Sequence, residues 1–285
     1  MSQLSNIGVI RDIMARHGFS FSKALGQNFL INPTVCPRMA ELGGAAAGVG
    51  VLEIGAGVGV LTAELAARAD KVVCVEVDGR LLPVLAETLA DYPNVEIVHA
   101  DVMKIDLAAL LREKFSGLEV VVCANLPYYI TSPILMSLLE QQLAVRSITV
   151  MVQREAAQRI CASPGTREVG AISIAVRYYS EPRVLFQVSR GSFLPAPEVD
   201  STVIRLDVRQ TPSVNADAHA FFQVVRAAFS QRRKTVVNSL ASGLGIPKAQ
   251  AAALCEGAGI FAGARAEQLS MAQFGALAAC LQQLQ

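Results

Sequence analysis

Residues 51–62, VLEIGAGVGVLT, contain the pattern that decides the fold. The apolar run at 51–54 is typical of a strand buried in a parallel sheet, and the residues after the glycines have helical character. Between them, Gly55, Gly57 and Gly59 predict a turn in which backbone N–H groups can approach a ligand closely. The segment therefore predicts the first half of a β-α-β unit whose turn borders a binding crevice.

Further apolar runs continue the alternation of strand and helix and predict a parallel sheet covered on both faces. These runs span residues 72–77, 95–100, 119–125 and 147–152. Two more β-rich runs, at 183–188 and 201–208, have no long helix between them and predict an antiparallel addition at the sheet edge. The expected fold class is α/β, with a Rossmann-like sheet of seven strands.

The clearest helix start lies in TSPILMSLLEQQ, residues 131–142. Ser132 can accept a hydrogen bond from a first-turn N–H group, and Pro133 fits the first helical position, where a missing donor has no cost. We therefore expect a helix that is capped by Ser132 and begins at Pro133.

The composition changes after the polar, turn-rich stretch RQTPSVNAD. Ala, Gln and Leu then recur at helical spacing, with breaks near residues 243–247 and 257–263. We therefore predict two domains. The first covers residues 1–210, with a flexible segment at 1–22, and the second is a smaller all-helical domain over residues 211–285.

The composition excludes several classes of protein. The 285 residues include 25 Lys and Arg against 24 Asp and Glu, so the chain is not a generally basic nucleic-acid coat protein, although a local basic face is allowed. The mean hydropathy of +0.41 is high, but no apolar run reaches the roughly 18 residues of a membrane span. With no targeting pattern at the start, we expect a soluble, cytoplasmic protein that contacts no membrane.

The cysteines and histidines do not form a metal-binding pattern. The six cysteines are scattered, contain no C-x-x-C, and lie mostly in apolar runs, as expected for core residues in a reducing compartment. The three histidines are far apart. We expect no metal site.

The glycine spacing and two carboxylates indicate the kind of ligand. A dinucleotide fingerprint, G-x-G-x-x-G, would need glycine at position 60, where this chain has Val60. An acid followed by G-x-G-x-G is typical of S-adenosylmethionine sites. Glu76 ends the next strand and can accept from both ribose hydroxyls, and Asp101 follows the third strand and can accept from an adenine amino group. Because all lie at carboxyl ends of parallel strands, they predict a nucleoside-containing cofactor.

The fourth strand ends in Asn125-Leu126-Pro127-Tyr128, a sequence suited to a planar amino group. The side-chain oxygen of Asn125 and the carbonyl of Leu126 could hold its two N–H bonds and push the nitrogen lone pair out of plane. Pro127 would fix the turn, and Tyr128 would offer a face for stacking. A methyl acceptor held in this way needs no strong general base.

These segments together closely resemble the small-subunit ribosomal RNA adenine N6,N6-dimethyltransferase family. The resemblance runs from about residue 20 to the C-terminus and rests on GQNFL (26–30), VLEIGAGVGVLT (51–62), CVEVD (74–78), ADV (100–102), NLPYYITSPIL (125–135), VQREAAQRI (152–160), SFLPAPEVDSTVIRL (192–206) and AFSQRRKT (228–235). It implies that S-adenosylmethionine is used, and S-adenosylhomocysteine formed, in dimethylating two adjacent adenosines in the hairpin loop near the 3′ end of 16S rRNA. The implied partner is the 30S particle, and a monomer is expected.

The resemblance also carries roles for individual residues. It implies that the cofactor is bound by Asn28, Leu30, Gly55, Glu76, Asp101 and Asn125. Phe193 is implied to stack on the target adenine opposite the Tyr128 side. The chain departs from the family at position 198, where many relatives carry Lys and this chain has Glu198, so the resemblance implies no rRNA contact there.

A neutral protein that binds a ribosomal particle must concentrate its cations. The best candidates for phosphate contacts are Arg226, Arg232, Arg233 and Lys234, joined by Arg154 and Arg159 after the fifth strand. An isolated RRK run would more often be a solvated helix face. Beside a methyltransferase site, it favours RNA binding.

Three alternatives remain open. A related methyltransferase could modify adenine in large-subunit rRNA or DNA, or a glutamine amide, with the same Asn-Pro-Tyr chemistry. A nucleotide-dependent oxidoreductase is opposed by Val60. A non-catalytic role in particle assembly could exist in addition, because docking and methyl transfer are separable.

Overall fold

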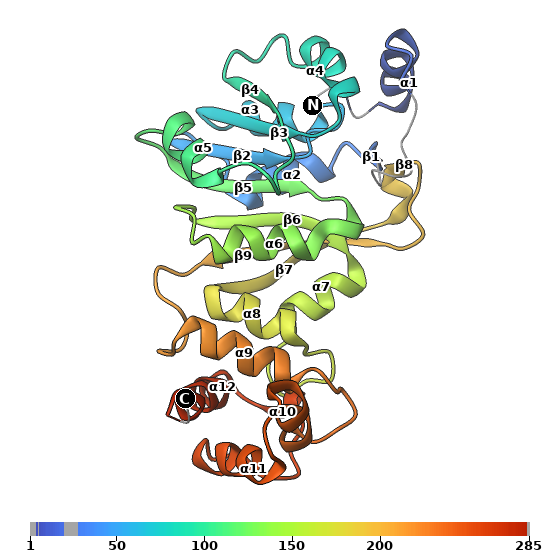
Figure 1. The fold of residues 1–285 in the computed structure, drawn as a ribbon. Helices are drawn as coiled ribbons and strands as arrows, with labels where there is room; N and C mark the ends of the chain where they lie inside the picture. The colour runs from blue at the N-terminus through green and yellow to red at the C-terminus, as the bar shows by residue number, and fades with distance from the viewer. Residues whose placement is uncertain (1–3, 5, 20–27, 284–285) are drawn as a thin grey trace. The chain divides into compact units, whose positions relative to one another are not determined.

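The computed structural model describes residue 4, residues 6–19 and residues 28–283. Its largest element is a seven-stranded mixed sheet with strand order β4-β3-β2-β5-β6-β9-β7, so the predicted seven-stranded α/β fold is confirmed (Figure 1). The strands are β2 (Val49–Ile54), β3 (Lys71–Glu76), β4 (Val95–His99), β5 (Glu119–Asn125), β6 (Ser147–Gln153), β7 (Ser180–Val188) and β9 (Ser201–Val208). Strands β2 to β6 pair in parallel and β9 is antiparallel to β6, as the β-rich run at 201–208 predicted.

Helices lie on both faces of this sheet (Figure 1). Every residue of the central strand β2 is buried, which explains why its sequence, VGVLEI, is apolar apart from Glu53 and does not alternate with polar residues. The helices before β7 are α1 (Ile7–Arg16), α2 (Val35–Gly43), α3 (Val60–Ala66), α4 (Leu82–Thr88), α5 (Leu107–Lys114), α6 (Thr131–Glu140), α7 (Arg154–Cys161) and α8 (Ala171–Tyr179). The later ones are α9 (Ala218–Ala228), α10 (Val236–Leu244), α11 (Lys248–Gly257) and α12 (Met271–Gln282).

The expected start of α6 was wrong. A short 3₁₀ turn, Tyr128–Ile130, runs directly into the helix, so α6 begins at Thr131 and its preceding residue, Ile130, makes no side-chain cap. The Thr131 hydroxyl donates to the Pro127 carbonyl at 3.2 Å. Pro133 is therefore the third helical residue, still within the first turn, where a backbone donor is not needed.

The chain divides into two compact units. The first contains residues 1–157 and 183–208, and the second contains residues 158–182 and 209–285. The expected domains, 1–210 and 211–285, differ from these units mainly in the segment 158–182. Of the N-terminal segment 1–22 that we expected to be flexible, residues 1–3, 5 and 20–22 lie outside the described residues, and residues 7–16 form α1.

An aromatic cluster explains why residues 158–182 belong to the second unit. The Tyr178 ring lies 4.5 Å from the ring of Phe221 and 5.1 Å from that of Phe222, centroid to centroid. Phe221 also packs against Phe274 of α12. Helix α8 thus contributes to the core of the helical unit, which α9, α10, α11 and α12 otherwise form.

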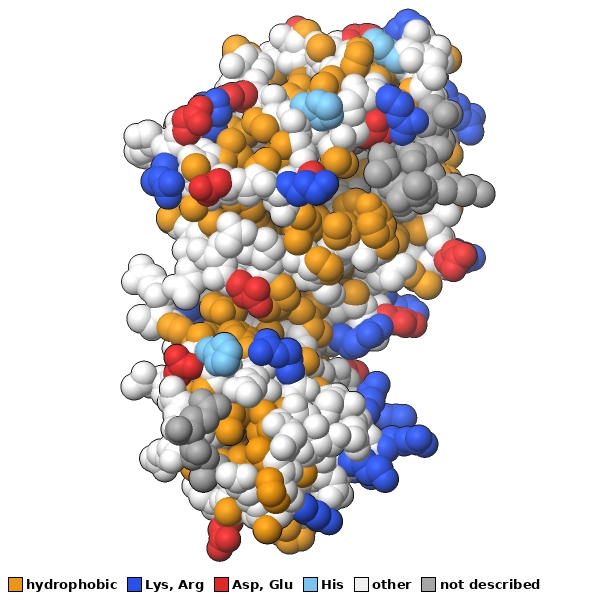
Figure 2. Space-filling model, in the orientation of Figure 1, with side chains coloured by type: hydrophobic (Ala, Val, Ile, Leu, Met, Phe, Trp, Pro, Cys, Tyr) orange, Lys and Arg blue, Asp and Glu red, His pale blue; other side chains and the backbone are white. Residues whose placement is uncertain are grey.

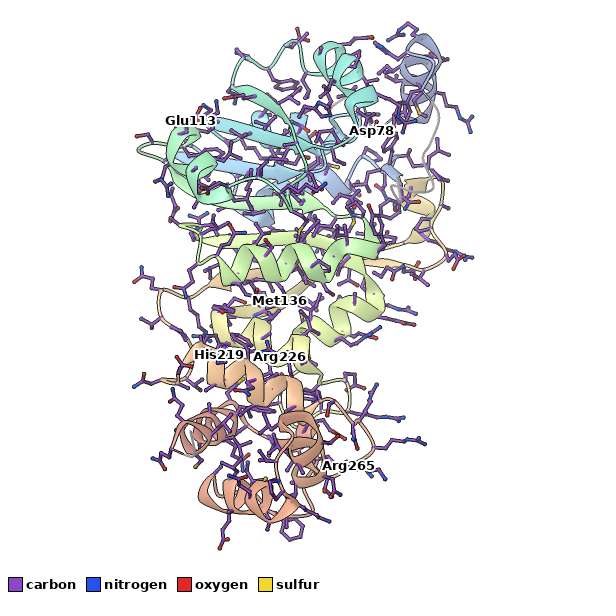
Figure 3. All side chains as sticks on the ribbon, viewed as in Figure 1. Asp78, Glu113, Met136, His219, Arg226 and Arg265 are labelled. Atoms are coloured by element: carbon purple, nitrogen blue, oxygen red, sulfur yellow. The ribbon has the colours of Figure 1, made fainter. Side chains whose placement is uncertain are left out.

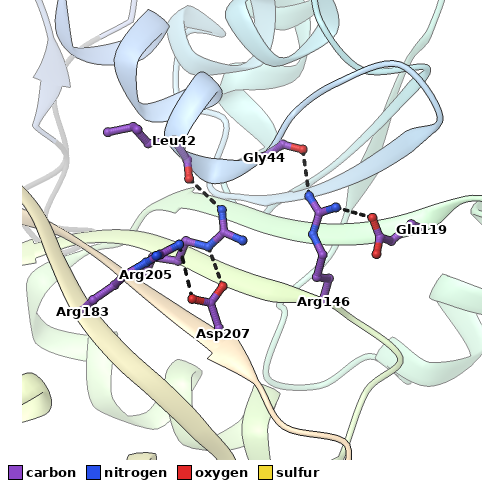
Figure 4. Close-up of polar contacts among 7 residues, drawn as sticks. All are labelled: Leu42, Gly44, Glu119, Arg146, Arg183, Arg205 and Asp207. Atoms are coloured by element: carbon purple, nitrogen blue, oxygen red, sulfur yellow. Dashed lines mark hydrogen bonds and ion pairs between the residues drawn. The ribbon is translucent and has the colours of Figure 1, made fainter.

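Two arginines hydrogen-bond the end of α2 to the sheet, at the end where the parallel strands begin (Figure 4). Arg205 Nη1 donates to the Leu42 carbonyl at 2.8 Å, and Arg146 Nη2 donates to the Gly44 carbonyl at 3.2 Å. Asp207 holds Arg205 through its Nε at 2.7 Å, and Glu119 pairs with Arg146. Cations at the end of α2 satisfy carbonyls that have no partner within the helix. The candidate site lies at the other end of the sheet, where the parallel strands have their carboxyl ends.

A second, two-stranded sheet covers part of the end of the large sheet at which the parallel strands finish. Strand β1 (Phe29–Leu30) pairs antiparallel with β8 (Phe193–Leu194), so residues far apart in the chain are joined here. No helix within the described ranges is long and apolar enough to cross a bilayer.

Candidate active site

The glycine loop lies between the ends of β2 and β3. Gly55, Gly57 and Gly59 have φ of +77°, +60° and +86°, a backbone region that only glycine adopts without strain. The Gly55 N–H donates to the Val75 carbonyl at 2.9 Å, which holds the loop against β3. A side chain at Gly57 would lie 3.4 Å from the ring of Phe29, so β1 packs directly over the loop.

Glu76, the last residue of β3, is 4% exposed and faces this loop. Its Oε2 accepts from the Gly57 N–H at 3.2 Å and its Oε1 from the Asp78 N–H at 2.8 Å. Burial raises the pKa of Glu76, and these backbone donors oppose that rise. Asp78, labelled in Figure 3, is held in turn by Arg80, whose Nε and Nη2 donate to its two oxygens at 2.8 and 2.6 Å.

A cavity of about 100 Å³ lies beside Glu76. It is bordered by Asn28, Phe29, Gly55, Gly57, Glu76, Val77, Leu81, Asn125, Leu126, Pro127, Tyr128 and Tyr129. A smaller cavity of about 40 Å³ shares Gly55 and Asn125 and adds Leu30. Five of the six residues predicted to bind the cofactor therefore line adjoining cavities, and one of these cavities also contains the Asn-Leu-Pro-Tyr turn.

Hydrogen bonds fix the geometry of this turn. Asn125 Nδ2 donates to the Asn28 carbonyl at 3.5 Å, so the amide presents its nitrogen to Asn28 and directs its oxygen elsewhere. The Ile130 N–H donates to the Pro127 carbonyl at 3.2 Å. The Tyr128 hydroxyl lies 2.6 Å from the Ser201 hydroxyl at the start of β9, and burial raises the pKa of Tyr128. The turn is thus anchored by Asn28, which precedes β1, and by Ser201 of β9.

Two predicted residues are not brought to these cavities. Asp101 borders neither, and its carboxylate accepts from the Met103 N–H at 3.0 Å and pairs with Lys104 at 3.4 Å. Phe193 is 2% exposed, because it pairs with Leu30 in the two-stranded sheet and packs in the core of the first unit. The cofactor role of Asp101 and the stacking role of Phe193 remain predictions.

The predicted RNA-binding residues fall into both units. Arg154 begins α7 in the first unit and lies 3.8 Å from Asp200. Arg226, Arg232, Arg233 and Lys234 all lie in the helical unit and are exposed. Figure 3 labels Arg226 on α9.

Glu53 is the acid that precedes the glycine pattern, and it is a site residue to which we assigned no separate role from the sequence. It borders the smaller cavity, is 1% exposed, and accepts from the Cys74 thiol at 3.2 Å. Burial raises its pKa to about 7, although hydrogen bonds from Thr62 and Cys74 oppose the rise. One acid within an otherwise apolar strand, VLEI, is the signal that could have predicted its burial.

The candidate site is distinguished from the other cavity by its lining residues and not by its volume. A larger cavity of about 380 Å³ lies near the opposite ends of the strands, bordered by residues such as Leu111, Phe115 and Leu143. Among the described residues, no carboxylate borders this larger cavity. Within the described ranges, no group of three His, Cys, Asp or Glu side chains is arranged to hold a metal ion.

Residues 18–283 match the family described as ribosomal RNA adenine dimethylase. The chain belongs to this family.

Individual members of the ribosomal RNA adenine dimethylase family are close in sequence. The chain is 47% identical over 282 residues to a protein from Geobacillus thermodenitrificans (strain NG80-2) named ribosomal RNA small subunit methyltransferase A, with 97% of this chain and 96% of that protein covered. A protein of the same name from Shouchella clausii (strain KSM-K16) is 48% identical, with 94% and 92% covered.

Solved structures agree with the fold. A dimethyladenosine transferase from Plasmodium falciparum matches with a TM-score of 0.72 and 25% identity, covering 87% of this chain and 95% of that one. The 23S rRNA methyltransferase ErmE matches with a TM-score of 0.68 and 27% identity, covering 90% and 100%. The chain is thus closer in sequence to the small-subunit enzymes than to ErmE.

Proposed function

We propose that this protein uses S-adenosylmethionine to dimethylate N6 of two adjacent adenosines in the 3′-terminal hairpin loop of 16S rRNA, within the 30S particle. The observation that carries the proposal is the cavity that joins Glu76 and the glycine loop to Asn125 and Tyr128 in one space. The names and identities of the small-subunit relatives support the choice of rRNA.

The residues around Glu76 fit S-adenosylmethionine. A buried carboxylate that borders a cavity and forms no ion pair among the described residues suits a neutral hydroxyl donor, such as a ribose, better than a cation. The left-handed glycines bring backbone close to the same cavity. S-adenosylmethionine would supply a methyl group on positively charged sulfur, and this chain would supply the position for it.

The Asn-Leu-Pro-Tyr turn would hold the acceptor. Because Asn125 gives its nitrogen to the Asn28 carbonyl, its oxygen is the atom left to accept from an adenine amino group, together with the Leu126 carbonyl. The hydrogen bond with Ser201 fixes the hydroxyl of Tyr128. The Tyr128 ring would therefore offer the base a fixed face for stacking. Positioning and electrostatics would then provide most of the rate, without a strong general base.

The roles of the other predicted residues belong to the same proposal. Asp101 would bind the cofactor and Phe193 would stack on adenine once the segments around them adjust to substrate. Arg154, Arg226, Arg232, Arg233 and Lys234 would contact rRNA phosphates, so that the helical domain at 211–285 holds RNA for the methyltransferase domain at 1–210. The protein would act in the cytoplasm as a monomer.

Transfer of labelled methyl groups tests the proposal. Undermethylated 30S particles, 50S particles and a short DNA duplex are each incubated with the protein and labelled S-adenosylmethionine, and the nucleosides are analysed. Label only in N6,N6-dimethyladenosine from 30S particles is expected. Label in 50S particles would favour a large-subunit adenine methyltransferase, label in DNA would indicate a DNA methyltransferase, and particle binding with no transfer would leave only an assembly role.

A further inference from the structure

Five cations gather on three turns of the helical unit. They are Arg167, between α7 and α8; Arg232, Arg233 and Lys234, between α9 and α10; and Arg265, which follows α11. All five are exposed, and within the described ranges none has a carboxylate within ion-pair distance. Lys and Arg side chains crowd one edge of this unit in Figure 2, and Figure 3 labels Arg265 there.

One side-chain and two backbone hydrogen bonds connect the three turns. Arg232 Nη2 donates to the Arg167 carbonyl at 3.3 Å, and the Gly165 N–H donates to the Glu267 carbonyl at 2.9 Å. The Val236 N–H donates to the Ala264 carbonyl at 2.8 Å. The cations therefore belong to one connected surface and are not scattered along separate loops.

An aromatic side chain stands on one of these turns. Phe261 is 81% exposed, the most exposed of the large hydrophobic side chains in the described residues. Its carbonyl accepts from the Ala264 N–H at 2.9 Å, which closes a turn that Ala264 links to the start of α10. The ring leans over Gly263, where a side-chain carbon would come within 2.6 Å of it. Glycine at 263 thus gives the ring a place against the backbone, with its outer face toward solvent.

We propose that Phe261 and the surrounding cations form a binding site for an unpaired RNA nucleotide. The base would stack on the Phe261 ring, while Arg167 and Arg265 would join the Arg232–Lys234 turn in contacting the flanking phosphates. The proposal rests on the proposed function in taking RNA as the partner. It adds a base-stacking residue, outside the methyltransferase cavities, to the phosphate contacts already proposed.

Charge and chemistry favour RNA over a protein partner. The whole chain carries a formal charge of only +1, so five unpaired cations on one surface are a local concentration and not a general property. A flat, exposed ring amid cations suits the π-face of a base and its phosphates together. A partner protein would need a complementary apolar surface, and Phe261 is a single ring and not a patch.

The absence of tryptophan from the chain allows a direct test of stacking. Phe261→Trp introduces the only tryptophan, whose fluorescence a stacked base should quench. The full-length variant is titrated with a short single-stranded oligoribonucleotide and with an abasic strand of equal length and charge. Quenching by the first and not the second is expected. Val184→Trp, at a 53% exposed position on β7 in the first unit, is the control that should not respond.

Affinity for 30S particles provides the second measurement. Phe261→Ala should weaken binding about 5- to 150-fold, the range found when one stacked aromatic is removed, and Phe261→Tyr should restore it. Arg265→Ala should lower the slope of log affinity against log salt by about one. Unchanged affinity of Phe261→Ala, or equal quenching by the abasic strand, would overturn the inference. Quenching by RNA with no methyl transfer by the wild type would refute the proposed function and leave this site standing.

Discussion

Replacing Glu53 by glutamine should remove a pH dependence of stability that this buried carboxyl group creates. Burial raises the pKa of Glu53 from an ordinary 4.5 to about 7 in the folded protein. Between these values the folded state binds more protons than the unfolded state, so the free energy of unfolding falls as pH rises. At about 1.4 kcal/mol per pH unit, the loss reaches about 3 kcal/mol once the pH exceeds 7.

Glutamine is the appropriate replacement because it keeps the shape of the side chain. One amide oxygen can still accept from the Cys74 thiol, and the amide nitrogen can donate to the Thr62 hydroxyl, which accepts as well as donates. Urea unfolding of wild type and Glu53→Gln is followed at about pH 5 and about pH 8. The difference between the two proteins should shift by about 2.5 kcal/mol in favour of the variant at the higher pH, because the wild type has already lost about 0.8 kcal/mol at pH 5.

Comparing the variant with wild type at each pH removes the contributions of carboxylates that both proteins contain and that titrate alike in both. These include Glu96, whose pKa is lowered by its hydrogen bond with Lys114 and whose stabilising effect is lost at low pH. Glu140→Gln, at an exposed position of α6, is the matched control and should show no such shift. If the free energies of unfolding of Glu53→Gln and wild type differ by the same amount at both pH values, burial does not raise the pKa of this carboxyl group.

Three further substitutions test the site. Asn125→Ala should lower methyl transfer to 30S particles by at least about 100-fold while particle binding, measured by sedimentation, stays intact; equal loss of binding would contradict the separation of docking from transfer. Glu76→Gln should raise the Kd for S-adenosylmethionine, measured by calorimetry, about 10- to 100-fold, because one oxygen that could accept from a ribose hydroxyl becomes an N–H donor, and an unchanged Kd would remove Glu76 from the cofactor site. Gly57→Ala should cost about 1–2 kcal/mol of stability, since its φ of +60° is left-handed, and an unchanged Tm would show that the loop relaxes.

The parts of the site that could be predicted are local in sequence. Glycines that need positive φ, an acid at a strand tip and the Asn-Leu-Pro-Tyr turn each depend on a few consecutive residues and on the parallel sheet that aligns strand ends. Because parallel strands have their carboxyl ends at the same end of a sheet, the strand assignments alone place Glu76 and Asn125 close together.

The parts that could not be predicted depend on distant partners. Ser132 looks like a helix cap in isolation, but the turn at Tyr128–Ile130 already starts the helix before it. The assignment of residues 158–182 depends on Tyr178 packing against Phe221, and the burial of Phe193 depends on pairing with Leu30. None of these pairings has a local sequence signal.

The pairing of β1 with β8 has a consequence for synthesis of the chain on the ribosome. The glycine loop, Glu76 and Asn125 all emerge before Phe193, so a growing chain that ends earlier contains these residues but lacks the strand that pairs with β1. Ser201, which anchors Tyr128, and β9, which pairs with β6, emerge later still. Closing such long loops is slow and must wait for the distant segment. Cofactor capture should therefore begin only after residue 208 has left the exit tunnel, and stalled shorter chains should fail to bind S-adenosylmethionine.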